Sequence, residues 1–324
     1  MRFPLVACLL VTACSGLKPQ LIRASVEKPS NVAVYFTVDT VKGEPVPGLT
    51  AEQFHIYEDE KLVSPYESKQ TILNPEVAAE HDTLLLVDLS GSVTQSGQVN
   101  ALQDAVNAFI ERVGKLQHVA LYAFDGRPDV VQLRGFGAAA APVSLSGFVS
   151  TDLSTNLNGA VVKSVEALQH QLEKSQSPLR FGTLVIFTDG TDHAHRVERS
   201  VALKAIRDVS FEVFVIGVGA EIDEQELKAF SKSGAALSKD ASTVGEQFGK
   251  IAERIEGMSR RFYLLSYCSP SRAGKHTLAI EPFLADGQSG RMSYDFDATG
   301  FEPRCDPNRK PSFDVRRPAL PKPF

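Results

Sequence analysis

The chain has 324 residues, and its 34 basic and 39 acidic side chains leave a net charge of −5. This length indicates two compact units, and a hydrophobic content of 43% is enough to fill their cores. The negative net charge argues against nucleic acid as a partner, because phosphate backbones are bound by concentrated basic surfaces. The four cysteines include no CxxC pair, which argues against a zinc site built from cysteines.

The first residues have the pattern of an export signal. Arg2 precedes a short apolar run from Phe3 to Ala13, and Cys14 follows. The segment Val11-Thr12-Ala13-Cys14 resembles the lipobox of bacterial lipoproteins, which implies removal of residues 1–13 and lipidation of Cys14. An ordinary signal peptide that contains a cysteine is the alternative. The lipoprotein hypothesis places the protein outside the cytosol, membrane-anchored in the outer membrane or periplasm, or on the cell surface, of a bacterium.

A polar segment and a small β module are predicted next. Residues 14–30 are polar and are predicted to form a tether. Residues 31–79 are predicted to form the β module, because apolar and polar side chains alternate from Val32 to Asp39 as in a strand. A Gly/Pro-rich turn and a second short strand over residues 55–57 follow.

The pattern changes at residue 80. Continuous apolar runs, as expected for strands buried on both faces of a parallel sheet, alternate with amphipathic helical stripes. This alternation predicts a doubly wound, mostly parallel α/β sheet with helices on both faces over residues 80–260. The runs cover residues 83–87, 119–124, 183–188 and 211–218, and the stripes cover Leu102–Val113, Leu157–Leu172, Val201–Val209 and Val244–Met258.

Strand patterns return after the α/β region and predict a C-terminal β module over residues 261–301. Residues 302–324 contain six prolines and are predicted to form an irregular tail. Cys268 and Cys305 lie in this part of an exported chain, so we expect a disulfide that ties the tail to the module. Two free thiols are the alternative.

Three motifs with oxygen-bearing side chains lie within the α/β region. Asp88-x-Ser90-x-Ser92 stands at the carboxyl end of the first buried strand, Thr155 precedes a helix, and Asp189 follows a later buried strand. Short carboxylate and hydroxyl side chains suit a hard divalent cation. Each motif alone is also what a turn or a helix cap carries, so the prediction depends on the three together.

In this order and separation, the motifs resemble the metal-ion-dependent adhesion site of the von Willebrand factor type A family, over about residues 80–260. The resemblance implies a bound Mg²⁺, or Mn²⁺ or Ca²⁺, with an acidic side chain of a partner protein in the open coordination position. It also implies that the strand order reverses beside the first strand. A domain that folds with a degenerate site is the alternative. The implied ligands are the hydroxyls of Ser90, Ser92 and Thr155 and, directly or through water, the carboxylates of Asp88 and Asp189.

The flanks resemble the ends of bacterial secreted proteins related to this family. The resemblance rests on residues 43–54 and 57–59, and on residues 262–267 and 274–276. It implies one β-sandwich built from both ends of the chain, with the A domain inserted between them. Two separate small β modules are the alternative.

We therefore expect a lipid-anchored envelope protein, not an enzyme, that binds a partner protein through its metal site. A metal-assisted hydrolase, such as a phosphatase, is one alternative, but Ser90 replaces the second acid of an Asp-x-Asp nucleophile motif, and the sequence has no Gly-x-Ser-x-Gly elbow or Walker loop. A metal-independent structural scaffold is the other. His193 and His195 are expected to be exposed loop residues. The resemblance also implies that the final helix, Val244–Met258, moves when ligand binds.

Overall fold

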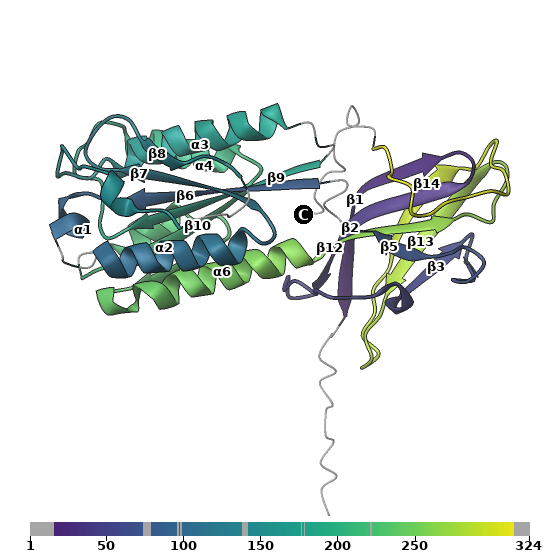
Figure 1. Cartoon of the computed structure of the whole chain (residues 1–324). Coiled ribbons are helices and arrows are strands. Elements are labelled where there is room, and N and C mark those ends of the chain that lie inside the picture. The colour runs from purple at the N-terminus through teal and green to yellow at the C-terminus, as the bar shows by residue number, and fades with distance from the viewer. Residues whose placement is uncertain are drawn as a thin grey trace, which may run out of the picture. The chain divides into compact units, whose positions relative to one another are not determined.

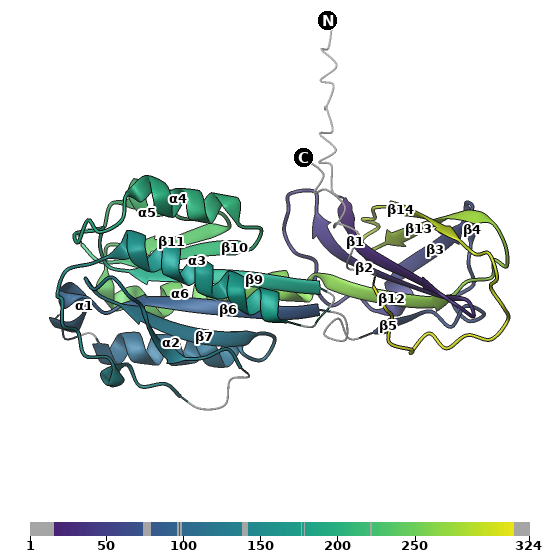
Figure 2. The same ribbon diagram turned by 90° about the horizontal axis from the view of Figure 1, so that it is seen from above.

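The computed structural model describes residues 16–73, 79–95, 97, 99–137, 142–175, 177, 179–220 and 222–313. They form two units, whose elements are labelled in Figures 1 and 2. The first unit contains the described residues before position 78 and those from position 260 on, and the second contains the described residues between them. The predicted signal over residues 1–13 and the predicted lipidation site at Cys14 lie outside the described residues, as do residues 314–324.

The first unit is a β-sandwich of two antiparallel four-stranded sheets. Each sheet joins strands from both ends of the chain, so the flanking segments form one module and the alternative of two separate modules was wrong. The order in one sheet is β1 (Leu17–Glu27), β2 (Asn31–Thr40), β12 (Phe262–Cys268) and β5 (Thr71–Leu73), and in the other β14 (Met292–Asp297), β13 (Lys275–Pro282), β3 (Phe54–Glu58) and β4 (Lys61–Leu62).

Aromatic side chains fill the space between the two sheets. Phe36 on β2, Phe54 on β3 and Tyr263 on β12 pack against one another with ring centroids 5.4 to 5.8 Å apart. The Tyr263 hydroxyl donates to the carbonyl of Val46 at 2.6 Å and accepts from the N–H of Leu49 at 3.1 Å. This side chain therefore holds the Gly/Pro-rich turn before β3 against the core, after which a single 3₁₀ turn (Ala51–Gln53) leads into the strand.

The prediction of a tether over residues 14–30 was wrong. Leu17–Glu27 is β1, and it pairs with β2 along its whole length, from Leu17 opposite Thr40 to Glu27 opposite Asn31. β1 is an edge strand in which only Leu17 and Ser25 are buried. A strand with so little buried surface needs few apolar residues, and its polar composition hid it from the pattern analysis.

The predicted disulfide between Cys268 and Cys305 is present, with the two Cα atoms 5.7 Å apart. It attaches the irregular C-terminal segment to the end of β12. The same segment is held by Phe313, which is buried and lies edge-on to Tyr35 with ring centroids 6.5 Å apart.

The second unit is built around a six-stranded sheet in which only the edge strand β8 is antiparallel, as the doubly wound α/β prediction requires. Two strands follow β6 on one side, and the chain then returns to the other side for β9. The strand order therefore reverses beside β6. The order is β11 (Gly234–Ser238), β10 (Glu212–Val218), β9 (Leu179–Thr188), β6 (Ala79–Asp88), β7 (His118–Phe124) and β8 (Val131–Arg134).

Helices cover both faces of this sheet (Figure 2). α2 (Val99–Val113) and α6 (Val244–Arg260) pack on the face that presents Leu85 and Val87 of β6. On the face of Leu84 and Leu86 lie α3 (Leu157–Lys174), α4 (Arg199–Asp208) and α5 (Glu224–Ala229). The short α1 (Gly91–Gln95) directly follows β6, and 3₁₀ turns occupy Leu145–Gly147 and Ala241–Thr243.

The buried stripe of α4 differs from the predicted one. Ala202 and Ile206 face the core, whereas Val201 is 49% exposed. Both sets fit a helical period, and the sequence pattern alone favoured the β-branched residue.

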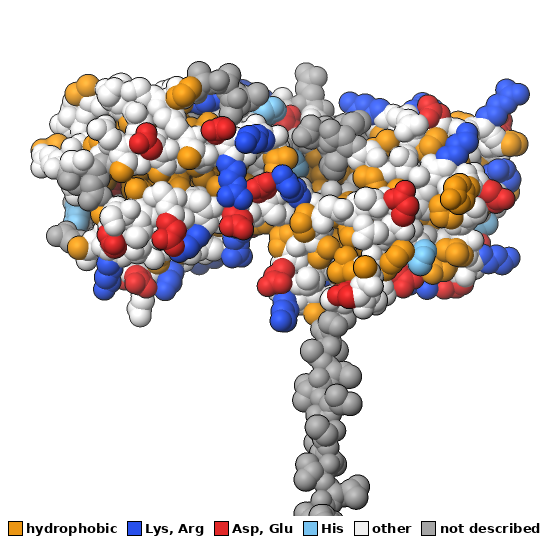
Figure 3. Space-filling view, turned by 60° about the horizontal axis from the view of Figure 1, so that its bottom comes forward, with side chains coloured by type: hydrophobic (Ala, Val, Ile, Leu, Met, Phe, Trp, Pro, Cys, Tyr) orange, Lys and Arg blue, Asp and Glu red, His pale blue; other side chains and the backbone are white. Residues whose placement is uncertain are grey.

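On the face shown in Figure 3, basic and acidic side chains are interspersed over the surface. None of the helices in the described part of the chain has the length and hydropathy that a membrane span requires.

Candidate metal centre

The Asp88 and Asp189 motifs meet at the carboxyl edge of the six-stranded sheet. β6 ends at Asp88 and β9 ends at Thr188, and the two strands are parallel neighbours with Val87 opposite Phe187. The Thr188 hydroxyl donates to Asp88 Oδ2 at 2.7 Å. Asp189 is the next residue, so the reversal of strand order brings the two carboxylates to one place, as the family resemblance implied.

A chain of hydrogen bonds connects four of the five predicted ligands. The Ser90 N–H donates to Asp88 Oδ1 at 2.9 Å, and the Ser90 and Ser92 hydroxyl oxygens are 3.2 Å apart. The Ser92 hydroxyl then donates to Asp189 Oδ1 at 3.0 Å. Asp88 and Ser90 have no exposed surface, whereas Ser92 is exposed. The cluster is therefore closed on the side of Asp88 and open on the side of Ser92.

Thr155 belongs to a loop that lies beside this cluster. The Gly91 N–H donates to the Leu153 carbonyl at 2.9 Å, which attaches the loop to the Ser90–Ser92 turn. The Thr155 carbonyl accepts from the N–H groups of His193 and Ala194 at 2.9 and 3.0 Å, which attaches the loop to the segment after Asp189. The structure thus brings all three motifs together, while their role as metal ligands stays a prediction.

The Gly91 position requires a glycine because the two segments approach so closely. A Cβ atom placed on Gly91 would lie 2.9 Å from both the Cβ and the carbonyl oxygen of Leu153. Contacts this short force one segment to move. The glycine in the Asp-x-Ser-x-Ser motif is therefore a packing requirement of the site.

The electrostatics of the cluster fit a divalent cation. Burial raises the pKa of Asp88 to about 7, and the carboxylate of Asp189 adds to the rise, while hydrogen bonds from Thr188 and Ser90 oppose it. A buried carboxylate near a second one is costly without a counter-charge. Carboxylate and hydroxyl oxygens without nitrogen or sulfur are the donors that Mg²⁺, Mn²⁺ and Ca²⁺ accept. The residues present therefore fit the cation that the sequence predicted.

Two buried aspartates that were not among the predicted ligands hold the loops in place. Asp125, which follows β7, accepts at Oδ2 from the Ser150 hydroxyl and the Thr151 N–H, both at 3.1 Å. Although burial opposes it, hydrogen bonds from Arg127 and Thr151 keep the pKa of Asp125 below its usual range. The signal was an acid directly after an apolar run, in Phe124-Asp125-Gly126.

Asp192 has the same role on the other side. Its Oδ1 accepts from the Asn158 N–H in the first turn of α3 at 3.0 Å, and its Oδ2 accepts from the His195 N–H at 2.9 Å. The side chains of His193 and His195 are exposed, as predicted.

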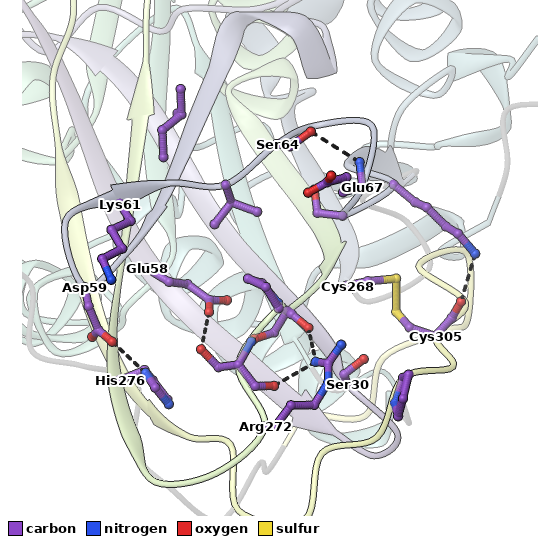
Figure 4. A pocket seen from close by; sticks show the side chains of 18 of the residues that line it. Ser30, Glu58, Asp59, Lys61, Ser64, Glu67, Cys268, Arg272, His276 and Cys305 are labelled. Carbon is purple, nitrogen blue, oxygen red and sulfur yellow. Dashed lines mark hydrogen bonds and ion pairs between the residues drawn. A yellow bond between two sulfur atoms is a disulfide. The ribbon is translucent and has the colours of Figure 1, made fainter.

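A separate hollow of about 700 Å³ lies in the β-sandwich unit (Figure 4). Charged side chains of both signs and the disulfide line it. Two of its acidic groups have partners: Glu58 accepts from the hydroxyls of Tyr267 and Ser271 at 2.9 and 2.6 Å, and Asp59 pairs with His276 at 2.7 Å. These two carboxylates are therefore engaged within the β-sandwich itself.

Comparison with protein-family profiles identifies a family that matches the α/β unit. The sequence profile of the von Willebrand factor type A domain matches residues 82–253. A search of curated proteins found no match.

Solved structures with similar folds share little sequence with this chain. A von Willebrand factor type A protein from Catenulispora acidiphila is 11% identical over 89% of this chain and 74% of its own, with a TM-score of 0.46. Manganese-loaded TRAP protein from Plasmodium vivax is 14% identical over 71% of this chain and 97% of its own, with a TM-score of 0.45. Proximal thread matrix protein 1 from the mussel byssus, with a zinc-occupied MIDAS motif, is 15% identical over 62% of this chain and 49% of its own, with a TM-score of 0.42.

Proposed function

The chain belongs to the von Willebrand factor type A domain family, and we propose that it is an exported bacterial envelope protein that binds a partner protein through a divalent cation. The observation that carries the proposal is the hydrogen-bonded chain from Asp88 through Ser90 and Ser92 to Asp189. The residues that would hold the cation are Asp88, Ser90, Ser92, Thr155 and Asp189. The proposed cation is Mg²⁺, with Mn²⁺ or Ca²⁺ as the alternatives.

The burial of these residues determines from which side a partner approaches. Asp88 and Ser90 are closed off beneath the loops, whereas Ser92 is exposed. A cation held largely by hydroxyl groups and water keeps enough positive charge to bind an additional carboxylate oxygen. A glutamate or aspartate of the partner would therefore enter on the Ser92 side.

Exposed apolar side chains beside the site suggest what surrounds that acid. Val149 and Leu153 belong to the loop that carries Thr155, and they are 71% and 56% exposed. Exposed apolar side chains that form a patch rimmed by polar groups mark interaction sites. We expect the partner to offer an acidic residue flanked by apolar ones.

Magnesium titration by calorimetry tests the cation. The parent protein should bind one Mg²⁺, and Asp88→Ala should abolish the binding heat. Asp104→Ala removes an exposed acid from α2 in the same unit and serves as the matched control. Equal magnesium binding by Asp88→Ala and the parent would refute the site.

Capture from envelope extracts tests the partner. The parent should retain a partner that EDTA releases, and Asp88→Ala should retain none. Leu153→Ser should weaken capture while magnesium binding is kept, because this change leaves the proposed ligands in place. Capture that is unaffected by EDTA would instead favour the metal-independent scaffold.

The proposed membrane anchor is the lipid on Cys14. Its support is the lipobox-like segment Val11-Thr12-Ala13-Cys14. Only Ser15 and Gly16 separate that cysteine from β1, so the β-sandwich would lie next to the membrane. Cys14→Ser should move the protein from the membrane fraction to the soluble fraction. Cys8→Ser is the control, because Cys8 leaves with the signal, and equal membrane retention of both variants would contradict the anchor.

A further inference from the structure

Three potential metal ligands gather at the edge of the six-stranded sheet opposite to Asp88. Glu80 and Asp82 lie near the start of β6, and His118 is the first residue of β7. Asp82 and Asp88 are six residues apart on one strand, a distance of about 20 Å. The group is therefore distinct from the oxygen-only centre.

Strand geometry points the three side chains the same way. Glu80 and Asp82 are two residues apart on β6, so they share one face of the sheet. Asp82 and His118 are register partners on neighbouring parallel strands. His118 Nδ1 is 3.3 Å from Glu80 Oε1 and 3.4 Å from Asp82 Oδ1, and one ligand atom of each residue lies within 4.8 Å of the others.

Asp82 supplies an independent sign that something belongs in this group. Its side chain has no exposed surface, and within the described residues neither of its carboxylate oxygens makes a hydrogen bond of standard geometry. Burial and the neighbouring Glu80 raise the pKa of Asp82 to about 6, although the His118 ring and the Gln171 side chain of α3 interact with it and lower the pKa. A fully buried carboxylate in this state is expensive unless a cation compensates it. Glu80, in contrast, accepts from the Ser175 hydroxyl at Oε2 and turns Oε1 toward His118.

We propose that Glu80, Asp82 and His118 form a second metal site, which takes Zn²⁺. One imidazole nitrogen and two carboxylates are a three-ligand set that Zn²⁺ accepts, with solvent in the remaining position. The two carboxylates balance the charge of the dication. The His118 side chain is 47% exposed, which gives the ion a path from solvent.

The donor set separates this site from the first one. Imidazole is a poor ligand for Mg²⁺ and Ca²⁺ and a good one for Zn²⁺. A protonated His118 that bridges the two carboxylates is the competing state, because the proton and the metal use the same Nδ1 atom. Bound Zn²⁺ would link β6 to β7 at their starts and stabilise the fold by mass action.

Zinc titration of the full chain tests the proposal. Asp88→Ala provides the background, with excess Mg²⁺ present, so that the first site contributes nothing. Zn²⁺ should bind with one equivalent and raise the unfolding temperature. His118→Gln and Glu80→Gln should each weaken zinc binding at least tenfold. Mg²⁺ in excess should not compete.

The exposed His-x-His loop of the same unit requires a control. The double variant His193→Gln/His195→Gln removes the exposed His-x-His loop and should bind Zn²⁺ like the background. Circular dichroism checks that each variant is folded, and Glu80→Gln, on a partly exposed side chain, stands in if His118→Gln does not fold. Unchanged zinc affinity in a folded Glu80→Gln variant, or loss only in the loop double variant, would overturn the proposal.

Discussion

In the proposed function, Asp88 would couple metal binding to the stability of the fold. Its carboxylate has no exposed surface and accepts from the N–H of Ser90, whose hydroxyl leads through that of Ser92 to Asp189. Without a cation, a buried carboxylate near a second one costs free energy. If Asp88 holds the proposed cation, this side chain weakens the metal-free protein and strengthens the metal-bound one. Its removal should then have opposite effects in the two states.

We predict that Asp88→Asn raises the free energy of unfolding of the metal-free protein by about 1–3 kcal/mol. The amide keeps the shape and the acceptor for the Ser90 N–H but carries no charge. Mg²⁺ at about 100 times its dissociation constant should stabilise the parent by about 2.7 kcal/mol and should leave the variant unchanged. Urea unfolding with and without Mg²⁺ measures both effects. A less stable metal-free variant would contradict the account of Asp88.

His276 gives the β-sandwich a pH-dependent contribution to stability. The ring nitrogen Nδ1 lies 2.7 Å from Asp59 Oδ2 at the wall of the hollow in Figure 4. The hydrogen bond with Asp59 and that with the Ala273 carbonyl raise the pKa of His276 above its usual value. A raised histidine pKa means that the folded state binds the proton more tightly than the unfolded state.

The stabilisation should be complete below about pH 6 and should disappear as the pH rises through the raised pKa. We predict that His276→Gln loses less than about 1 kcal/mol of pH-dependent stability, because Asp59 is half exposed and water screens the pair. The measurement compares unfolding free energies of parent and variant at acid and alkaline pH. Asp59→Asn should remove the same dependence. A parent–variant difference that is constant with pH would show that the pair contributes nothing.

The residues that could be predicted differ physically from those that could not. Asp88 and Asp189 stand directly at strand ends. The carboxyl ends of neighbouring parallel strands lie at the same edge of the sheet, whatever the exact register between the strands. Asp192 lies in a loop and accepts from backbone N–H groups of the first turn of α3 and of its own loop, and no periodicity encodes the course of that loop. Glu80 and His118 meet only because of the register between β6 and β7, which is fixed by packing and cannot be read from either strand alone.

At the level of elements, the contact between α1 and the Thr155 loop fixes how the Ser90–Ser92 turn and this loop lie beside each other in the proposed metal centre. α1 starts at Gly91, and the loop passes close enough to leave no room for a side chain there.

Helices with long buried stripes, such as α2, were easy to predict from the sequence. β1 was not, because an edge strand exposes most of its surface, and the stripe of α4 was ambiguous because two apolar sets fit one period.

We predict that Gly91→Ala weakens Mg²⁺ binding at least tenfold and lowers the free energy of unfolding by about 1–2 kcal/mol. The new Cβ must displace Leu153 and with it the loop of Thr155. Gly249→Ala is the matched control, because Gly249 lies within α6 and a methyl group added there would meet nothing within 4 Å. The Gly249→Ala protein should keep its Mg²⁺ affinity, and its free energy of unfolding should rise by about 0.5–1 kcal/mol. Equal affinities in calorimetry would mean that the loop does not shape the site.

Across the whole molecule, the disulfide stabilises one unit only. Cys268 and Cys305 are 37 residues apart and close a loop within the β-sandwich. We predict that Cys268→Ser/Cys305→Ser lowers the unfolding free energy of the sandwich by about 2–4 kcal/mol. Differential scanning calorimetry should show one transition shifted downward and the magnesium-sensitive transition unmoved. A shift of both transitions would show that the two units unfold as one.

The order of strands explains how one chain builds two cores. β5 ends at Leu73, and β12, which begins at Phe262, pairs with it antiparallel, with Leu73 opposite Leu264. In a simple hairpin a short turn would connect two such strands. Here the α/β unit occupies the place of that turn. The sandwich core itself is formed by strands that precede and follow the insertion.

We therefore predict that the β-sandwich folds when residues 75–260 are replaced by a short Gly/Ser linker. Arg261 is kept, because its Nη1 lies 3.3 Å from the carboxylate of Asp39, which is buried and would otherwise lose its counter-charge. The shortened chain should unfold cooperatively in urea and should form the Cys268–Cys305 disulfide, as mass spectrometry of the unreduced protein would show. Its circular dichroism should lose the helical signal. A chain that stays unfolded with the disulfide intact would show that the sandwich depends on the inserted unit, because the hairpin geometry of β5 and β12 would then not suffice to bring the two ends together.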